Sequence, residues 1–120
     1  MYELMAEETF DAAHALRGYK GSCENLHGHT FRAQLFLSGD KLNAIGLLVD
    51  FREIKAKLKK VIDRFDHKNL NDLEEFKNEN PSSENIARII FEKIKAEIPQ
   101  LVKTTVWESP GTCASYYDKI

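Results

Sequence analysis

Residues 30–38, TFRAQLFLS, decide the fold because apolar and polar side chains alternate along them. The apolar set is Phe31, Ala33, Leu35 and Leu37, and the polar set is Arg32, Gln34 and Ser38. Successive side chains of a β-strand point to opposite faces, so the pattern predicts a strand with one buried face. Residues 2–10 alternate more loosely and predict a second strand before it.

The period changes after Asp50. Apolar residues recur at helical spacing from Phe51 to Phe65 opposite a row of lysines, and Asp50 with Glu53 forms a capping start. A second helix is predicted after NPSSEN (80–85), where Ser82 or Ser83 can cap it, and Pro99 ends it.

Two further strands are predicted in LVKTTVWES (101–109) and CASYYDK (113–119), separated by a turn at Ser109-Pro110-Gly111. The order ββααββ predicts one α+β domain over residues 1–120, with a four-stranded antiparallel sheet and both helices on one face. The other face and the edges stay uncovered, so we expect the chain to oligomerise.

The charge of the chain indicates which class of partner to expect. The net charge is −2, with 17 basic and 19 acidic side chains mixed along the chain, which favours a small ligand over nucleic acid or a membrane surface. MYELMAEETF (1–10) lacks the pattern of a signal peptide, so we expect a cytoplasmic protein. In that reducing compartment we expect Cys23 and Cys113 to be free thiols. We expect Cys113 to pack near the last strand.

Histidines provide the first chemical signal. His27 and His29 flank Gly28 in a predicted strand, so both side chains point to one side and can share an ion. His14, expected just past the first strand, is the candidate third ligand of an open zinc site. The alternative is a pair of polar residues at a strand end, which is the commoner meaning of an isolated HxH.

Asp66 and His67 form a second candidate pair, because a carboxylate that orients an imidazole suits it for proton transfer. The alternative is a histidine favoured by the negative end of a helix. Cys23 is either a small buried residue or a thiol whose pKa nearby cations lower.

Seven segments together resemble the 6-pyruvoyl-tetrahydropterin synthase / 6-carboxy-tetrahydropterin synthase family, in the family's order and over nearly the whole chain. They are FDAAH (10–14), CENLHGH (23–29), LVDFREIK (48–55), DHKNLND (66–72), NPSSENIA (80–87), WES (107–109) and ASYY (114–117).

The resemblance implies the tunnelling fold, in which trimers form a twelve-stranded barrel and two trimers stack into a homohexamer. It implies that His14, His27 and His29 bind zinc, that Cys23 is the base, and that Asp66 and His67 complete a proton relay. Glu108 would anchor the pterin ring. Backbone N–H groups at Ser82 and Ser83, together with Glu84, would also meet the ligand, although helix capping alone explains the serines.

The substrate implied is 7,8-dihydroneopterin triphosphate, and two products compete. The short chain and compact CxxxHGH spacing favour the queuosine-pathway type, which releases acetaldehyde and triphosphate and forms 6-carboxy-5,6,7,8-tetrahydropterin. The alternative is the 6-pyruvoyl product. Glu24 adds a folate-pathway aldolase-like activity, because some relatives that make folate precursors use a glutamate in this loop. A different class of function is a non-catalytic zinc-binding assembly module.

Overall fold

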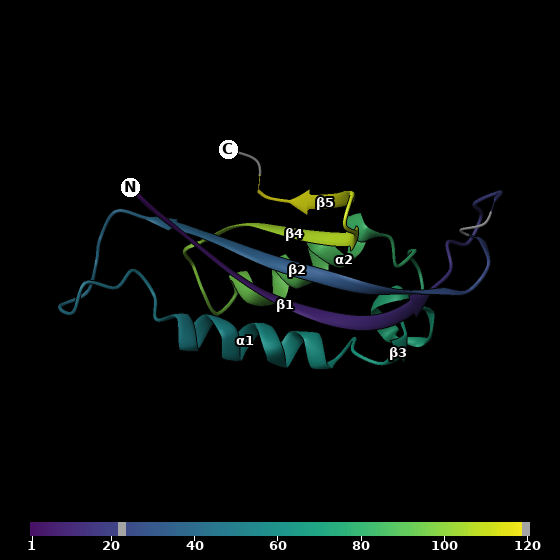
Figure 1. Ribbon diagram of the computed structural model, residues 1–120, viewed down its shortest axis with the longest axis horizontal. Helices are drawn as coiled ribbons and strands as arrows, with labels where there is room; N and C mark the ends of the chain where they lie inside the picture. Colours follow the sequence, from purple (N-terminus) through teal and green to yellow (C-terminus); the bar gives the residue numbers. More distant parts are fainter. Residues whose placement is uncertain (22–23, 119–120) are drawn as a thin grey trace.

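A computed structural model describes residues 1–21 and 24–118 of the chain (Figure 1). The elements, in chain order, are β1 (Tyr2–His14), β2 (His27–Gly39), α1 (Phe51–Asp63), β3 (Lys68–Asn69), the 3-10 turns Leu70–Asp72 and Glu74–Phe76, α2 (Ser83–Lys95), β4 (Leu101–Ser109) and β5 (Thr112–Tyr116). The predicted α+β class and both predicted helices are confirmed.

The sheet has five strands in the order β3-β1-β2-β4-β5, one more than predicted. The extra strand, β3, is only two residues long and runs parallel to β1, whereas the other pairs are antiparallel. The expectation of a purely antiparallel, four-stranded sheet was therefore wrong at this edge. Two residues are too short to show any periodicity, so sequence patterns could not indicate this strand.

Strand β1 also continues further than predicted. It pairs with β2 over thirteen consecutive positions, from Tyr2 opposite Gly39 to His14 opposite His27. The expectation that His14 lies in a connection after the strand was therefore wrong, because His14 is the last residue of β1.

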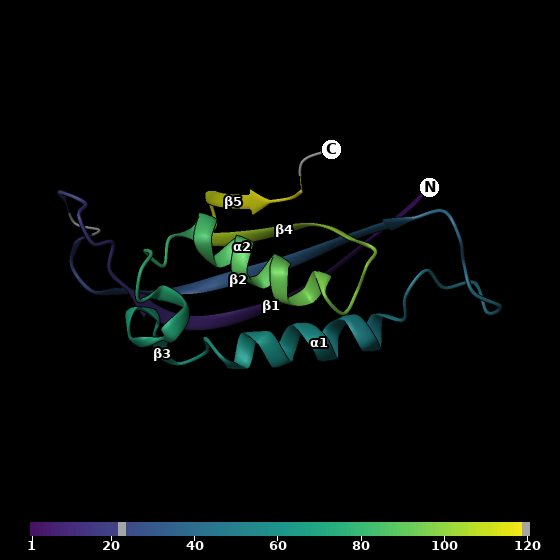
Figure 2. The ribbon, with the colours of Figure 1, turned by 180° about the vertical axis from the view of Figure 1, so that it is seen from behind.

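Both helices cover one face of the sheet. The sheet lies in front of α2 in Figure 1, and the reverse view in Figure 2 shows α2 in front of β4 with α1 along β1. The core between these layers is continuous. Its largest fully buried side chains include Phe10, Phe31, Leu35, Leu58 and Ile90. The predicted apolar face of residues 30–38 is thus the buried one.

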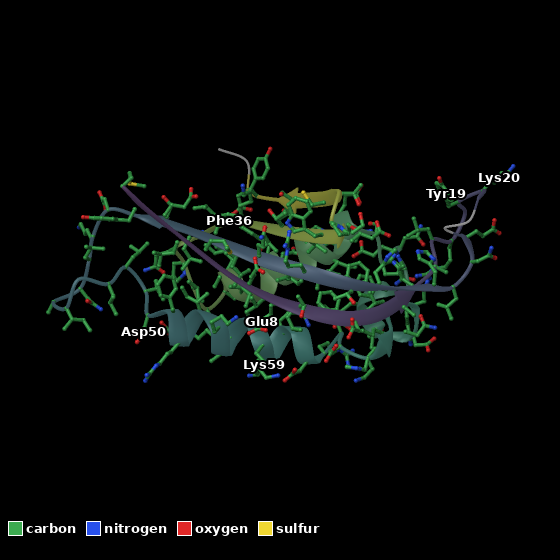
Figure 3. All side chains as sticks on the ribbon, in the orientation of Figure 1. Glu8, Tyr19, Lys20, Phe36, Asp50 and Lys59 are labelled. Atoms are coloured by element: carbon green, nitrogen blue, oxygen red, sulfur yellow. The ribbon has the colours of Figure 1, made fainter. Side chains whose placement is uncertain are left out.

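Side-chain caps set where the helices begin. The Asp50 side chain accepts a hydrogen bond from the Arg52 backbone N–H at 2.8 Å, at the start of α1 (Figure 3). The Ser82 hydroxyl accepts from the backbone N–H of Asn85 at 3.2 Å and caps α2. Phe51 is exposed, contrary to its predicted place on the apolar face, because it lies in the first turn of α1.

The end of β1 is tied to the segment before α2. The Asn71 side chain accepts from the Ala15 N–H at 2.8 Å and donates to the Ala15 carbonyl at 2.9 Å. Asn80 makes the same pair of bonds with the backbone of Arg17, at 2.8 and 2.9 Å. These contacts hold two loops, far apart in the sequence, side by side at one end of the sheet.

The face of the sheet that the helices leave uncovered carries a chain of polar contacts. Trp107 Nε1 donates to Gln34 Oε1 at 2.9 Å, Gln34 Nε2 donates to Glu7 Oε1 at 3.0 Å, and the Arg32 guanidinium lies 4.9 Å from the Trp107 ring centroid. Oligomerisation through this face stays a prediction. Cys113 is a free, exposed thiol, so its expected packing was wrong. No helix in the described ranges is long and apolar enough to cross a membrane.

Glu75 joins three segments on the helix side. Its carboxylate accepts two hydrogen bonds from the Arg64 guanidinium, at 2.9 and 2.7 Å, and one from Lys93 of α2 at 3.2 Å. These bonds, led by that from Arg64, hold the pKa of Glu75 at about 2, below its usual value of 4.5. The ionised carboxylate therefore stabilises the junction of α1 and α2.

We predict that Glu75→Gln lowers the free energy of unfolding at neutral pH by about 1 kcal/mol, the scale of a partly exposed ion-pair network. Because folding lowers this pKa, the stabilisation is complete above about pH 4.5 and disappears as the pH falls toward 2. Urea unfolding at several pH values measures the difference from wild type. Glu74→Gln, which removes an exposed pair with Lys77, is the control; equal losses from both variants would contradict the assignment.

Candidate functional site

Three histidines meet where β1 ends and β2 begins. His14 and His27 are directly opposite each other in the ladder, and His29 is two residues further along β2, on the same face as His27. The ring centroids of His14, His27 and His29 are 4.6 to 5.2 Å apart. Phe31 contacts the rings of His14 and His29 edge-on and separates the cluster from the core.

Backbone carbonyls orient two of the rings. His14 is 1% exposed, and its Nδ1 lies 2.6 Å from the carbonyl oxygen of Pro81, just before α2. His27 Nδ1 lies 2.7 Å from the carbonyl oxygen of Asn25. Because a carbonyl only accepts, each Nδ1 donates to its carbonyl, and Nε2 is the ring nitrogen left for the cluster.

Glu108 of β4 completes the cluster. Its Oε1 lies 3.2 Å from His14 Nε2 and 2.9 Å from His29 Nε2. The His29 contact does not have hydrogen-bond geometry, and this buried nitrogen has no hydrogen-bond partner in the part of the chain that the structure describes. Burial lowers the pKa of His29; Glu108 opposes this shift, and His14 and His27 add to it.

The arrangement fits a metal ion. One ligand atom from each of His14, His27, His29 and Glu108 lies within 4.8 Å of the others. Imidazoles whose Nε2 atoms face a common point, with a carboxylate beside them, form a donor set that zinc prefers. The predicted grouping of the three histidines is therefore present, and Glu108 joins them, which the sequence analysis did not foresee.

Asp66 and His67 lie in the loop after α1. Asp66 Oδ2 is 3.0 Å from His67 Nδ1, and Asp66 Oδ1 accepts from the backbone N–H of Asp11 at 2.9 Å. The His67 N–H donates to the Asp11 carbonyl at 2.6 Å. The hydrogen bond from Asp11, followed by that from His67, lowers the pKa of Asp66. The carboxylate thus stays ionised beside an imidazole, as the proton-relay interpretation requires.

The backbone of His67 has a conformation that residues other than glycine rarely adopt. Its φ is +58°, in the left-handed region, and its imidazole is 77% exposed. Such a backbone conformation persists only where the surroundings impose it. Here the His67 N–H donates to the Asp11 carbonyl, and the Asp11 N–H donates to the side chain of the neighbouring Asp66. A shallow depression of about 550 Å³ is lined by both His67 and His29. His67 and one member of the histidine cluster, His29, therefore border one space.

The residues at the start of α2 divide into two groups. The Ser82 hydroxyl caps the helix, which is the structural alternative for that residue. Ser83 is buried, and its hydroxyl lies 3.5 Å from Glu108 Oε2. Ser83, Glu84 and Glu108 line a pocket of about 210 Å³ together with Cys113 of β5.

Cys23, the predicted base, lies outside the described residues. Its neighbour Glu24 is exposed, and the Glu24 N–H donates to the Gly21 carbonyl at 3.1 Å. The sequence analysis missed Pro81, Asn25 and Asp11 because they act through their backbone, for which side-chain identity gives no signal. It also missed Asn71, although DHKNLND, the segment that contains it, contributed to the resemblance.

We predict that zinc binds the purified protein at one site and that His29→Ala weakens binding by more than about a hundredfold, because it removes a ligand rather than an outer contact. Isothermal titration calorimetry of metal-free protein measures the affinity. His67→Ala is the matched control and should bind zinc like wild type. The metal assignment fails if His29→Ala binds normally or if His67→Ala does not.

Comparisons with known proteins show which family this chain is similar to. The family model described as 6-pyruvoyl tetrahydropterin synthase matches residues 3–119. A 6-carboxy-5,6,7,8-tetrahydropterin synthase from Synechocystis is 36% identical, over 98% of this chain and 94% of that protein. A dihydroneopterin monophosphate aldolase from Pyrococcus furiosus is also 36% identical, over 83% of each chain.

A solved structure supports the fold as well. The Caenorhabditis elegans 6-pyruvoyl tetrahydropterin synthase superposes with a TM-score of 0.90 at 30% identity, covering 98% of this chain and 96% of that one. The family match spans nearly every residue, including all four residues of the histidine and glutamate cluster. The chain therefore belongs to the 6-pyruvoyl tetrahydropterin synthase family, whose members are enzymes that act on pterins.

Proposed function

We propose that the protein is a zinc-dependent lyase that converts 7,8-dihydroneopterin triphosphate and one water molecule into 6-carboxy-5,6,7,8-tetrahydropterin, acetaldehyde and triphosphate. The observation that carries the proposal is the shared depression, which is bordered by His29 of the histidine cluster and by His67, the partner of Asp66. A metal site alone would serve many functions. A metal site beside an oriented histidine supports proton transfer on a bound substrate.

Zinc held by His14, His27 and His29 would supply a Lewis acid, which makes the C–H and O–H bonds next to a bound hydroxyl more acidic. The carbonyls of Pro81 and Asn25 accept from Nδ1 of His14 and His27, so that Nε2 of each ring would be the metal ligand. Phe31 excludes water from the side of the cluster that faces the core.

The chain's own groups would move the protons. Cys23 is proposed as the base that removes a proton from the substrate side chain, because it precedes the ligand pair in CENLHGH. His67 returns a proton at another carbon, and Asp66 stabilises its protonated form from 3.0 Å. Both the elimination and the carbon–carbon cleavage need this pair of steps.

The substrate ring would bind beside Glu108. Its carboxylate can accept two hydrogen bonds from the amide edge of a pterin, and charge-assisted bonds of this kind are strong in a partly buried site. Ser83 and Glu84 line the pocket next to that carboxylate. This arrangement supports a substrate whose ring carries N–H donors in a row.

The names of the relatives support one product more than the others. The Synechocystis protein bears the 6-carboxy name, at 36% identity over nearly the whole chain. The 6-pyruvoyl product is the second candidate, because the C. elegans structure with TM-score 0.90 carries that name. An aldolase activity is favoured by the P. furiosus relative and by Glu24. The remaining alternative is a metal-binding assembly module without catalysis.

We predict that zinc-loaded protein incubated with 7,8-dihydroneopterin triphosphate yields acetaldehyde and a 6-carboxypterin, identified by mass spectrometry. Metal-free protein is the matched control and should give neither product. A pyruvoyl product would move the assignment to the second candidate. Cleavage of dihydroneopterin monophosphate alone would support the aldolase, and zinc binding without turnover of either compound would support the assembly module.

We predict that Cys23→Ala binds zinc like wild type and loses at least about a hundredfold in turnover, the usual contribution of a positioned proton-transfer group. Glu24→Gln is the matched variant, since it changes the adjacent residue of the same loop. Calorimetry gives the zinc affinity and single-turnover kinetics give the rate. Retained activity in Cys23→Ala together with loss in Glu24→Gln would transfer the role of base to Glu24.

Assembly belongs to the same proposal. We expect a homohexamer of two stacked trimers, because the polar face around Gln34 and Trp107 and the short strands β3 and β5 leave a face and two edges of this sheet uncovered. A cytoplasmic location and the lack of a nucleic-acid partner stay predictions from composition.

A further inference from the structure

Glu108 lies in a different place from the one its expected role requires. As an anchor for a substrate ring it should point away from the metal ligands, yet its Oε1 lies 3.2 Å from His14 Nε2 and 2.9 Å from His29 Nε2. Donor atoms about 2.0–2.1 Å from one tetrahedral ion are about 3.3 Å apart. The carboxylate oxygen therefore stands where a fourth ligand would stand.

The other oxygen of Glu108 faces the opposite way. Oε2 lies 3.5 Å from the Ser83 hydroxyl and borders the pocket of about 210 Å³ formed with Glu84, Thr112 and Cys113. The side chain is 30% exposed. It thus separates the histidine cluster from this pocket, and its position lets one carboxylate serve either side.

The backbone at Glu108 is suited to movement. Pairing of β2 with β4 ends at Trp107, opposite Arg32. The register between β4 and β5 shifts between Trp107 and Ser109, and Glu108 has no paired residue within the described strands. A bulge of this kind redirects one side chain and frees it from the ladder, and bulges are common beside active sites.

We propose that Glu108 is a displaceable fourth metal ligand that closes the site in the resting protein and leaves it when a ring bearing amide-type N–H donors binds in the Ser83–Glu84 pocket. The identity of that ring rests on the function proposed above. One carboxylate cannot keep its position on the ion and also align both oxygens with the edge of a ring. Binding of the ring therefore opens a coordination position for the hydroxyls of the substrate side chain.

This coupling has a thermodynamic consequence. If ring and metal compete for Glu108, the ring weakens metal binding by the same factor by which the metal weakens ring binding. It also orders the reaction, because the ion becomes available to side-chain hydroxyls only after the ring is seated. Glu108 is then a positioning residue, which controls access to the metal in addition to holding the ring.

The test uses Co²⁺ in place of zinc, because its visible absorption is strong when it has four ligands and falls when water or further ligands raise that number. The probe is 7,8-dihydropterin, which has the ring but lacks the hydroxylated side chain and so offers no side-chain ligand to the metal. We expect this compound to shift the absorption bands of wild-type protein, because water replaces the carboxylate on the ion, and to raise the Co²⁺ dissociation constant several-fold.

Two variants make the test specific. Without any ring, Glu108→Gln should give Co²⁺ bands shifted from those of wild type and a dissociation constant raised at least about tenfold, because water replaces the carboxylate ligand. Adding 7,8-dihydropterin should then change neither quantity. Glu84→Gln, from the same pocket, should keep the spectrum of wild type. Thermal unfolding of both variants checks that they fold.

The inference is overturned if Glu108→Gln and wild type have the same Co²⁺ spectrum without a ring, or if 7,8-dihydropterin leaves the wild-type spectrum and affinity unchanged. Both readings are independent of turnover. Conversion of the triphosphate substrate with an unresponsive spectrum would reject the inference alone. A responsive spectrum without conversion would support the inference and reject the proposed reaction.

Discussion

The uninterrupted pairing of β1 with β2 is the constraint on which the site depends. Thirteen consecutive positions pair without a shift, so His14 is placed opposite His27 and diagonal to His29. A slip of one residue would turn every side chain of one strand to the other face and separate the histidines. The same register buries Phe10 against Phe31, with ring centroids 5.0 Å apart. Burial of the core therefore fixes the position of the metal ligands.

A second set of contacts ties the helices and loops to this ladder. The Pro81 carbonyl, just before α2, holds the ring of His14, and the backbone of Asp11 in β1 holds both Asp66 and His67 after α1. His14, Asp66 and His67 are thus each fixed by a segment remote in sequence. The left-handed conformation of His67 is a local cost that these bonds offset, and it directs the imidazole to the depression shared with His29.

Alternation and helical spacing were sufficient for the main elements. The face of Phe31, Ala33 and Leu35 is buried as predicted, and the Asp50 and Ser82 caps start the helices where expected. The pattern failed at β3, which is too short to have a period, and at the last residues of β1, where two successive alanines and a histidine end the alternation although pairing continues. It also failed at Cys113, because β5 lies at an edge of the sheet and leaves that side chain exposed.

By itself, the sequence determined the fold class, the two helices, and the grouping of His27 with His29, because strand and helix periods are local properties of the chain. It also suggested His14, Asp66, His67 and Glu108 by residue type and by resemblance. Only the tertiary structure decided that Glu108 lies against the histidines, that Pro81 and Asn25 orient their rings, and that Asp11 holds the Asp66–His67 pair. Those contacts join residues up to 94 positions apart. They depend on strand register and on backbone groups, and neither is expressed in the identity of any single side chain.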